Sequence, residues 1–152
     1  MKIYNLGQIP ENKYSDIGGK AKGLDLLIKN NFNVPKGFLI TDIDLIDEKM
    51  IYDTFDSFNF KMVSVRSSAS NEDLLNKSNA GQFDTFLFVE RNSLIESIKK
   101  CVDSINDTRA IKYQEHFSLD NNNQMNVIVE EMIDSTKAGV IFTSNIKDLP
   151  FF

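Results

Sequence analysis

Residues 15–41 read SDIGGKAKGLDLLIKNNFNVPKGFLIT, and several structural signals follow one another within them. Two glycines and a lysine at 18–20 stand directly before a helical period of apolar residues, which ends near Asn30. A Pro-x-Gly turn and the apolar run GFLIT at 37–41 come next. This order predicts a tight turn, a helix that begins near Lys20, and then a strand over 37–41.

The glycines before this helix allow two interpretations. Glycines that lead into a helix N-terminus let successive backbone N–H groups turn toward an anion, and the helix dipole adds positive potential there. Lys20 would supply a full positive charge for a phosphate. The alternative is a tight helix start with a solvated lysine. A Walker loop is excluded, because its Gly-Lys-Ser/Thr ending is absent.

The remaining sequence alternates between strand-like and helix-like periods. Strand patterns occupy residues 2–6, 62–68, 83–89, 125–133 and 137–144, and helix patterns occupy 42–58, 94–105 and 108–117. The polar stretch 71–82, with a late glycine, is predicted as a loop. This interleaving predicts an α+β fold with mixed, mostly antiparallel sheets flanked by helices.

Apolar spacing predicts which helix positions point inward. They are Leu24, Leu27 and Ile28 in the first helix and Leu45, Ile46, Met50 and Ile51 in the second. Ser93 and Glu96 form a capping-box pattern at the start of the third helix. The single cysteine, Cys101, lies on the apolar stripe of that helix and is expected to be buried.

Composition bounds the class of protein. The chain has 152 residues, 41% of them apolar and 26% charged, which is ordinary for one globular domain. No stretch has the length of a membrane-spanning helix, and the N-terminus lacks a signal-peptide pattern, so we expect a cytoplasmic location without a membrane partner. A net charge of -5 argues against nucleic acid as the main partner.

Arg66 is a candidate anion-binding residue within the alternating strand 62–68. Val63 and Val65 should face one side of the sheet and Ser64 and Arg66 the other. The guanidinium fork suits a phosphate, and the hydroxyls of the following two serines, Ser67 and Ser68, would add hydrogen bonds. The alternative is an arginine paired with an acidic residue at 72 or 73.

Two further features suit a ligand site. The polar loop ends in Gly81 and Gln82, shortly before Thr85, and such a loop can close over a nucleotide as a lid. Glu130 and Glu131 interrupt an apolar strand, so one of them must face core residues or line a cavity. A plain connecting loop and an edge-strand surface are the respective alternatives.

Together these signals resemble the N-terminal nucleotide-binding domain of the pyruvate phosphate dikinase, phosphoenolpyruvate synthase and rifampin phosphotransferase family. The resemblance spans nearly the whole chain. Its stretches are IGGKAKGLDLL (17–27) with NVPKGFLIT (33–41), VSVRSSASNEDLLNKSNAGQFDTFLFV (63–89), IKKCVDSINDTRAIKYQEHF (98–117) and VIVEEMIDSTKAGVIFTSN (127–145).

The resemblance implies an ATP-grasp fold and a set of ATP-binding residues. Lys20 and Arg66 would hold the phosphates, Gly81 and Thr85 would belong to the covering loop, Glu130 would lie near the adenine, and the hinge around Met132 would read the adenine edge. The implied supporting residues are Gly18, Gly19, Ser67, Ser68 and Gln82. Glu130 replaces the family's usual glutamine, and a carboxylate accepts a hydrogen bond but donates one only when protonated.

Two departures from the family limit the implied activity. The region between Lys20 and Arg66 is shorter than the family norm, and the chain lacks the family's acidic Mg²⁺-ligand segment, phosphohistidine domain and phosphoenolpyruvate/pyruvate domain. The single histidine, His116, is expected at the surface. No catalytic residue or metal ligand is assigned.

The chain is therefore expected to be one partial ATP-grasp domain, with possible sublobes 1–66 and 67–152. It would be the ATP-binding portion of a dikinase-type phosphotransferase, with ATP as its cofactor and Mg²⁺ expected in the complete enzyme. A separate chain or a missing C-terminal segment would complete it. The alternatives are a subunit of a split phosphotransferase and a non-catalytic nucleotide-sensing module.

Charge reversal of Lys20 tests the anion-binding interpretation of the glycine turn. Lys20→Glu should abolish nucleotide binding without unfolding the domain, because a solvated lysine contributes little to stability. Calorimetric titration with Mg-ATP, together with a thermal melt, measures both properties. If the variant binds Mg-ATP as well as the parent, the turn is only a tight helix start.

Overall fold

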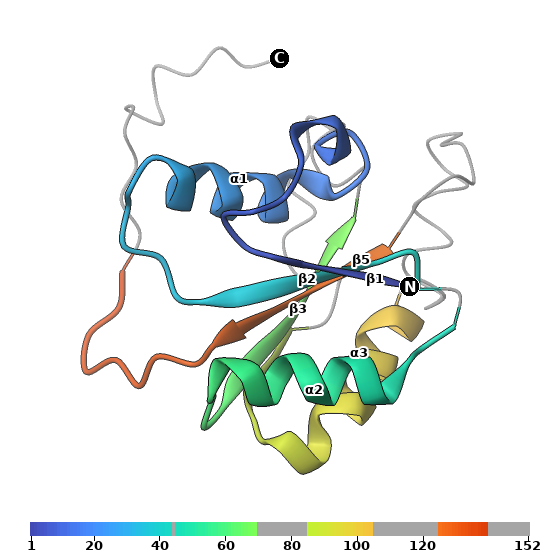
Figure 1. The fold of residues 1–152 in the computed structure, drawn as a ribbon. Helices are drawn as coiled ribbons and strands as arrows, with labels where there is room; N and C mark the ends of the chain where they lie inside the picture. The colour runs from blue at the N-terminus through green and yellow to red at the C-terminus, as the bar shows by residue number, and fades with distance from the viewer. Residues whose placement is uncertain (44, 70–84, 105–124, 140–152) are drawn as a thin grey trace, which may run out of the picture.

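The computed structural model describes four ranges of the chain (Figure 1), namely residues 1–43, 45–69, 85–104 and 125–139. The predicted loop 71–82, the predicted helix 108–117 and most of the predicted strand 137–144 lie outside these ranges, as do Gly81, Gln82 and His116.

The described strands form one five-stranded antiparallel sheet. They are β1 (Lys2–Asn5), β2 (Gly37–Thr41), β3 (Val63–Ala69), β4 (Thr85–Val89) and β5 (Met125–Glu131). Their spatial order is β1-β2-β5-β3-β4, and every neighbouring pair is antiparallel. The α+β prediction is confirmed. Strand β5 lies between β2 and β3, and the possible sublobe boundary after residue 66 falls within β3.

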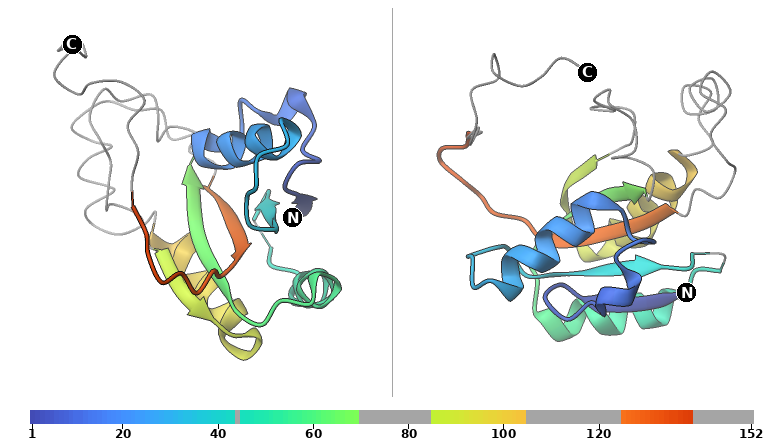
Figure 2. Two further views of the ribbon diagram at one scale, coloured as in Figure 1. Left: turned by 90° about the vertical axis from the view of Figure 1, so that its left-hand side faces the viewer. Right: turned by 90° about the horizontal axis from the view of Figure 1, so that it is seen from above.

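Helices cover both faces of the sheet. Helix α1 (Gly18–Lys29) lies on one face, and α2 (Glu48–Phe58) and α3 (Leu94–Asp103) lie on the other (Figures 1 and 2). Two short 3-10 turns, η1 (Glu11–Lys13) and η2 (Arg91–Ser93), lie in the connections. None of the helices in the described ranges is long and apolar enough to cross a membrane.

The central strands are buried on both faces because their side chains alternate between two cores. On β2, Phe38 and Ile40 join the core under α2 and α3, whereas Leu39 packs with Ile17 and Ala21 under α1. All five residues of β2 are buried. The expected burial of the cysteine at 101 is confirmed, since its side chain belongs to the α2/α3 core.

The second helix is shorter than its sequence pattern suggested. It begins at Glu48, because the side chain of Asp47 accepts a hydrogen bond from the Met50 N–H at 3.0 Å and thereby caps the first turn. Leu45 therefore precedes the helix and is 80% exposed. The inward assignments of Leu45 and Met50 are wrong, whereas that of Ile51 is confirmed.

Two smaller predictions about the helices are also wrong. Ser93 does not cap α3, since its hydroxyl donates to the Glu90 carbonyl at 3.1 Å. Glu96 instead pairs with Lys100 one turn later, at 2.7 Å. In α1, Leu27 is 42% exposed, whereas Leu24 and Ile28 pack against the core on that face of the sheet.

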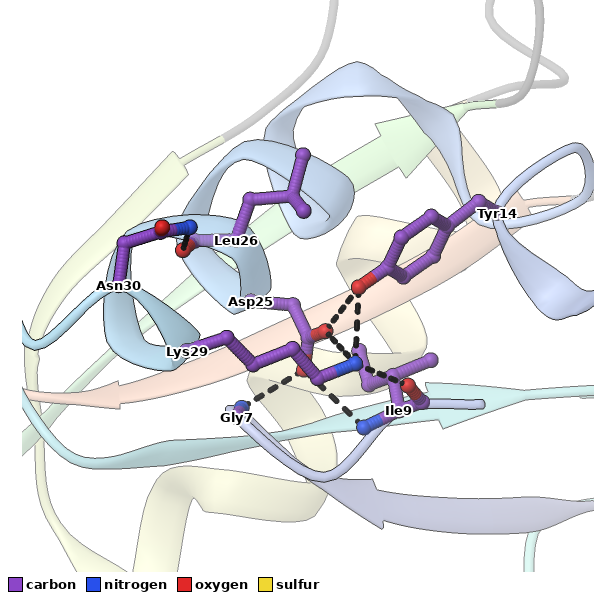
Figure 3. Close-up of polar contacts among 7 residues, drawn as sticks. All are labelled: Gly7, Ile9, Tyr14, Asp25, Leu26, Lys29 and Asn30. Carbon is purple, nitrogen blue, oxygen red and sulfur yellow. Dashed lines mark hydrogen bonds and ion pairs between the residues drawn. The ribbon is translucent and has the colours of Figure 1, made fainter. Parts of the chain in front are cut away.

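A buried carboxylate fastens α1 to the loop that precedes it (Figure 3). Asp25 is fully buried, and it accepts hydrogen bonds from the backbone N–H groups of Gly7 at 2.7 Å and Ile9 at 3.0 Å. The Tyr14 hydroxyl donates to the same carboxylate at 2.6 Å, and the Lys29 ammonium pairs with it at 2.8 Å. One side chain thus satisfies four donors from three segments of the chain.

The cation in this network is shared. Lys29 also donates to the Ile9 carbonyl at 2.6 Å and to the Tyr14 hydroxyl at 2.8 Å. Burial alone would raise the pKa of Asp25, but the hydrogen bonds from Lys29, Tyr14 and the two backbone N–H groups outweigh burial and hold the pKa below its usual range. Asp25 is therefore ionised at neutral pH.

Removal of this charge should destabilise the domain. Asp25→Asn presents an amide N–H₂ to a cluster of donors and leaves Lys29 without its anion, so the free energy of unfolding should fall by about 3 kcal/mol at pH 7. The lowered pKa means that ionised Asp25 adds stability above its unfolded-state pKa and that this stability is lost as the pH falls through its folded-state pKa. Urea unfolding should show the difference between parent and variant shrinking in acid.

The matched control is Asp53→Asn. Asp53 pairs with Lys49 across one helical turn, as Asp25 does with Lys29, but both partners are exposed. Its loss should change the free energy of unfolding by less than about 0.5 kcal/mol. Equal effects of the two variants would contradict the role given to the buried network.

Candidate functional site

Strand β3 presents different residues to the two faces of the sheet. Val63 and Val65 lie in the α2/α3 core, whereas Ser64 and Arg66 face the side that carries α1 and line a pocket there. The alternation predicted for this strand is confirmed. The guanidinium of Arg66 therefore leaves the sheet beside α1, next to the end of β5.

The pocket lies where β3, β4 and the end of β5 meet α1. Its volume is about 510 Å³, which is within the range of small-molecule sites. The lining residues are Leu24, Pro35, Ser64, Arg66, Thr85, Leu87, Glu130, Glu131, Met132 and Ile133. Polar and charged groups gather on the strands, and the apolar side chains of Leu24, Leu87 and Ile133 complete the wall.

Four of the predicted ATP-binding residues line this one pocket. Arg66, Thr85, Glu130 and Met132 come from three separate segments of the chain. Thr85 stands opposite Arg66 in the register of β3 and β4. Strand β5 brings Glu130 opposite Ser64, on the other side of β3.

Arg66 and Glu130 form an ion pair inside the pocket. The Nη1 of Arg66 lies 3.4 Å from the Oε2 of Glu130. The carboxylate is buried, whereas 39% of the Arg66 side chain is exposed. A guanidinium has five N–H donors in a fixed fork, and this long contact engages one of them. Glu130 thus orients Arg66 while leaving donors for a bound anion.

The pocket disfavours a charged Glu130. Burial raises the pKa of Glu130 above its usual value, and the charge and hydrogen bond of Arg66 oppose that shift only in part. Glu130 is an acidic residue within an otherwise apolar, buried stretch of β5, and its side chain lines the pocket. Such a raised pKa is typical of functional sites.

The segment after β5 is anchored through its backbone. The Glu131 N–H donates to the Lys36 carbonyl at 2.8 Å, and the Met132 N–H donates to the Met62 carbonyl at 3.0 Å. Both N–H groups already donate to backbone carbonyls of the protein. Met132 would therefore contact a ligand in the pocket through its side chain or its carbonyl. Ile133, which follows, is 51% exposed.

The glycine turn lies at the start of α1, as predicted from its sequence. Gly18 has a φ of +75°, a left-handed conformation that suits glycine, and the helix begins there rather than at Lys20. Gly18, Gly19 and Lys20 are not among the residues that line the pocket.

The two serines after Arg66 point in opposite directions. Ser68 lies on the α1 side, where its hydroxyl donates to the Ile17 carbonyl at 2.7 Å and accepts from the Ala21 N–H at 3.2 Å. Ser67 is also buried, and its hydroxyl has no hydrogen-bond partner among the described residues. We find neither serine among the residues lining the pocket.

Several lining residues were not assigned from the sequence. Ser64 and Leu87 are two positions from Arg66 and Thr85 along their strands, so the period of two that placed Arg66 also indicated them. Leu24 was assigned only to the core. Pro35 was recognised only as part of the Pro-x-Gly turn, because a residue in a connection has no periodicity that shows which way its side chain points.

Within the described ranges, no cluster of three or more histidine, cysteine, aspartate or glutamate side chains could hold a metal ion. A shallow depression of about 360 Å³ lies along α2, lined by Asp47, Lys49, Met50, Asp53, Thr54 and Ser57. These residues belong to one helix and its cap, so the depression brings no distant segments together.

Comparison with known proteins identifies the domain. Residues 43–150 match the family described as pyruvate phosphate dikinase, AMP/ATP-binding domain. This segment is more than half of the chain, and it contains Arg66, Thr85, Glu130 and Met132 but not Lys20. The protein is an α+β domain of the ATP-grasp type, and the chain belongs to this family.

Individual relatives agree with this assignment. The chain is 42% identical over 83 residues to a probable phosphoenolpyruvate synthase of Methanothermobacter thermautotrophicus, covering 53% of this chain and 12% of that protein. It is 26% identical over 193 positions to the phosphoenolpyruvate synthase of Aeropyrum pernix (91% and 24% covered). It is 30% identical over 162 positions to the uncharacterized phosphotransferase YvkC of Bacillus subtilis (82% and 19% covered).

The chain spans between an eighth and a quarter of the length of these relatives. The alignments to the last two relatives are longer than the 152 residues of the chain, so these proteins contain segments without a counterpart here.

Neutralising Glu130 should stabilise the folded protein at neutral pH. A raised folded-state pKa means that ionisation costs folding free energy, and this cost appears as the pH rises through that pKa. Glu130→Gln avoids the cost, so its melting temperature should exceed the parent's at pH 7, and the gain should vanish near about pH 4, where both side chains are neutral.

The neighbouring variant Glu131→Gln is the control, because Glu131 is exposed and should leave the melting temperature unchanged. A lower melting temperature for Glu130→Gln at pH 7 would contradict the argument, since the ion pair with Arg66 would then outweigh the cost of burial.

Proposed function

We propose that this domain binds ATP in the pocket between β3, β4, the end of β5 and α1, as the ATP-binding part of a dikinase-type phosphotransferase. The observation that carries the proposal is the convergence of Arg66, Thr85, Glu130 and Met132 on one pocket of about 510 Å³. These residues lie in the segment that matches the AMP/ATP-binding family. The relatives named as phosphoenolpyruvate synthases support the class of reaction.

Arg66 is the proposed phosphate-binding residue of the pocket. Its guanidinium is half-exposed and is held by a buried carboxylate, so it is oriented before a ligand arrives. Charge-assisted hydrogen bonds from such a fork match two phosphate oxygens at once. Thr85, exposed and opposite Arg66 on β4, would add a hydroxyl to the same phosphates.

The adenine end of the proposed site combines acceptors with apolar surface. An ionised Glu130 accepts from the exocyclic amino group of adenine but cannot donate to a ring nitrogen. The side chains of Leu24, Leu87 and Ile133 offer apolar contact for the faces of the base. Met132 follows Glu130 on the same rim and would contribute its side chain or carbonyl.

The glycine turn is proposed to complete the phosphate site. Gly18, Gly19 and Lys20 open α1, whose N-terminal dipole favours an anion, and α1 contributes Leu24 to the wall of the pocket. Gly81 and Gln82 are proposed to belong to a loop that covers the nucleotide, as the family resemblance implies.

Mg²⁺ is proposed as the partner of the bound nucleotide in the complete enzyme. In the complete enzyme, Mg²⁺ would supply neutralisation of the charge that develops during phosphoryl transfer. The described residues contain no carboxylate cluster to hold it, so no metal ligand is assigned among them. The contribution proposed for this domain is to bind and orient ATP, in the cytoplasm, without nucleic acid or membrane.

Loss of the Arg66 guanidinium should weaken ATP binding selectively. Hydrogen bonds to charged groups are worth about 1.5–3 kcal/mol, so Arg66→Ala should reduce Mg-ATP affinity by about 10- to 100-fold. Adenosine, which carries no phosphate, should lose much less affinity than Mg-ATP. Isothermal titration calorimetry with both ligands gives the comparison.

Arg91→Ala is the matched control. Arg91 is an exposed arginine that pairs with Asp56 through two nitrogens, at 2.7 and 2.8 Å, and lies outside the pocket. Its loss should leave Mg-ATP affinity unchanged. Equal ATP affinity of the Arg66 variant and the parent would overturn the proposed site.

A further inference from the structure

The start of α1 is attached to the sheet by two buried polar side chains. Ser68 on β3 donates to the Ile17 carbonyl at 2.7 Å and accepts from the Ala21 N–H at 3.2 Å. Asn126 on β5 donates through its side-chain amide to the Asp16 carbonyl at 2.8 Å and to the Ser68 carbonyl at 3.2 Å. The exposed fractions of Ser68 and Asn126 are 0% and 1%, so water does not compete for these bonds.

The Ser68 hydroxyl contacts both ends of the first turn of α1, through the Ile17 carbonyl and the Ala21 N–H. These are the two backbone groups that pair in the first turn of a regular α-helix. The two contacts bracket three residues, Gly18, Gly19 and Lys20, which form the turn proposed to hold phosphate.

The helix has no local cap that would replace this attachment. Its N-cap position is Ile17, which has no side chain capable of a capping hydrogen bond. Gly18 has a φ of +75°, so the turn is built from a residue with wide conformational freedom. The conformation of the turn therefore depends on β3 and β5 as well as on its glycine.

The same strands and the same face carry the proposed phosphate-binding arginine. Ser64, Arg66 and Ser68 are alternate residues of β3, and Asn126 stands opposite Ser68 in the register with β5. Successive same-face residues of a strand are about 7 Å apart. The turn is thus attached to β3 at Ser68, which is the next residue after Arg66 on the same face of the strand.

We propose that Ser68 and Asn126 are positioning residues for nucleotide phosphates. They hold the Gly18–Lys20 turn in register with Arg66 and do not contact the nucleotide, because their hydrogen bonds go to the backbone of the protein. This inference rests on the proposed function. It replaces the direct phosphate contact expected of Ser68 with an indirect role, and it assigns a role to Asn126, which sequence patterns did not single out.

The test compares ATP with adenosine in the full chain. Ser68→Ala removes one oxygen atom, and Asn126→Ala removes the second attachment independently. Each should reduce Mg-ATP affinity about tenfold while leaving adenosine affinity unchanged, because only the phosphate end loses its alignment. Calorimetry for Mg-ATP, a nuclear magnetic resonance titration for adenosine and thermal melts cover affinity and folding.

Ser104→Ala is the matched control for lost stability. Ser104 is also buried, and its hydroxyl donates to the Cys101 carbonyl at 2.7 Å at the end of α3. This variant should lower the melting temperature as Ser68→Ala does, yet keep the ratio of ATP to adenosine affinity.

The outcomes separate the two proposals. An unchanged ratio in the Ser68 and Asn126 variants, with a parent that binds ATP, would overturn the positioning role. A reduced affinity for both ligands alike would also overturn it, because the loss would then be general. A parent that binds no ATP would overturn the proposed function itself.

Discussion

The antiparallel register of β3 against β5 places Ser64 opposite Glu130 and Ser68 opposite Asn126. Directly opposed residues have side chains about 5 Å apart, so this register puts Glu130 within reach of Arg66 and Asn126 within reach of the start of α1. A slip of β5 by one residue against β3 would send the side chains of Glu130 and Asn126 to the opposite face of the sheet. The pocket and the attachment of the glycine turn therefore depend on the same pairing.

The second constraint acts on α1 from its other side. Asp25 and Lys29 fix the later turns of the helix to the loop around Gly7 (Figure 3). Ser68 fixes its first turn to β3. Buried, satisfied polar groups of this kind define one arrangement, because an alternative packing would leave a charge or a carbonyl unpaired. The helix that carries Lys20 and Leu24 is thereby held at both ends against the face that contains the pocket.

Much of the fold was predictable from the sequence because its signals were local. The alternation of Val63 and Val65 with Arg66 predicted the strand and its faces, and the strand GFLIT was recognisable from composition. The start of α2 was missed because the side chain of Asp47, rather than the apolar period, decides where that helix begins. Ser93 was misjudged for the related reason that the Glu90 carbonyl competes for its hydroxyl.

The candidate site was predictable in part. The family resemblance named Arg66, Thr85, Glu130 and Met132, which line one pocket. The partner of Arg66 was not predictable, because Glu130 lies 64 residues away and becomes its neighbour only when β5 inserts beside β3. The role of Ser68 and the involvement of Asn126 likewise depend on tertiary contacts between residues 47 or more positions apart.

The central claim is that a nucleotide occupies the pocket between β3, β4 and β5. The most direct measurement is a titration of the isotopically labelled chain with Mg-ATP, followed through backbone amide resonances. The account predicts saturable shifts at residues 64–68, 85–87 and 130–133 and at the start of α1, with none along the exposed face of α2. Shifts confined to the α2 face, or absent from residues 64–68 and 130–133 at saturation, would contradict it.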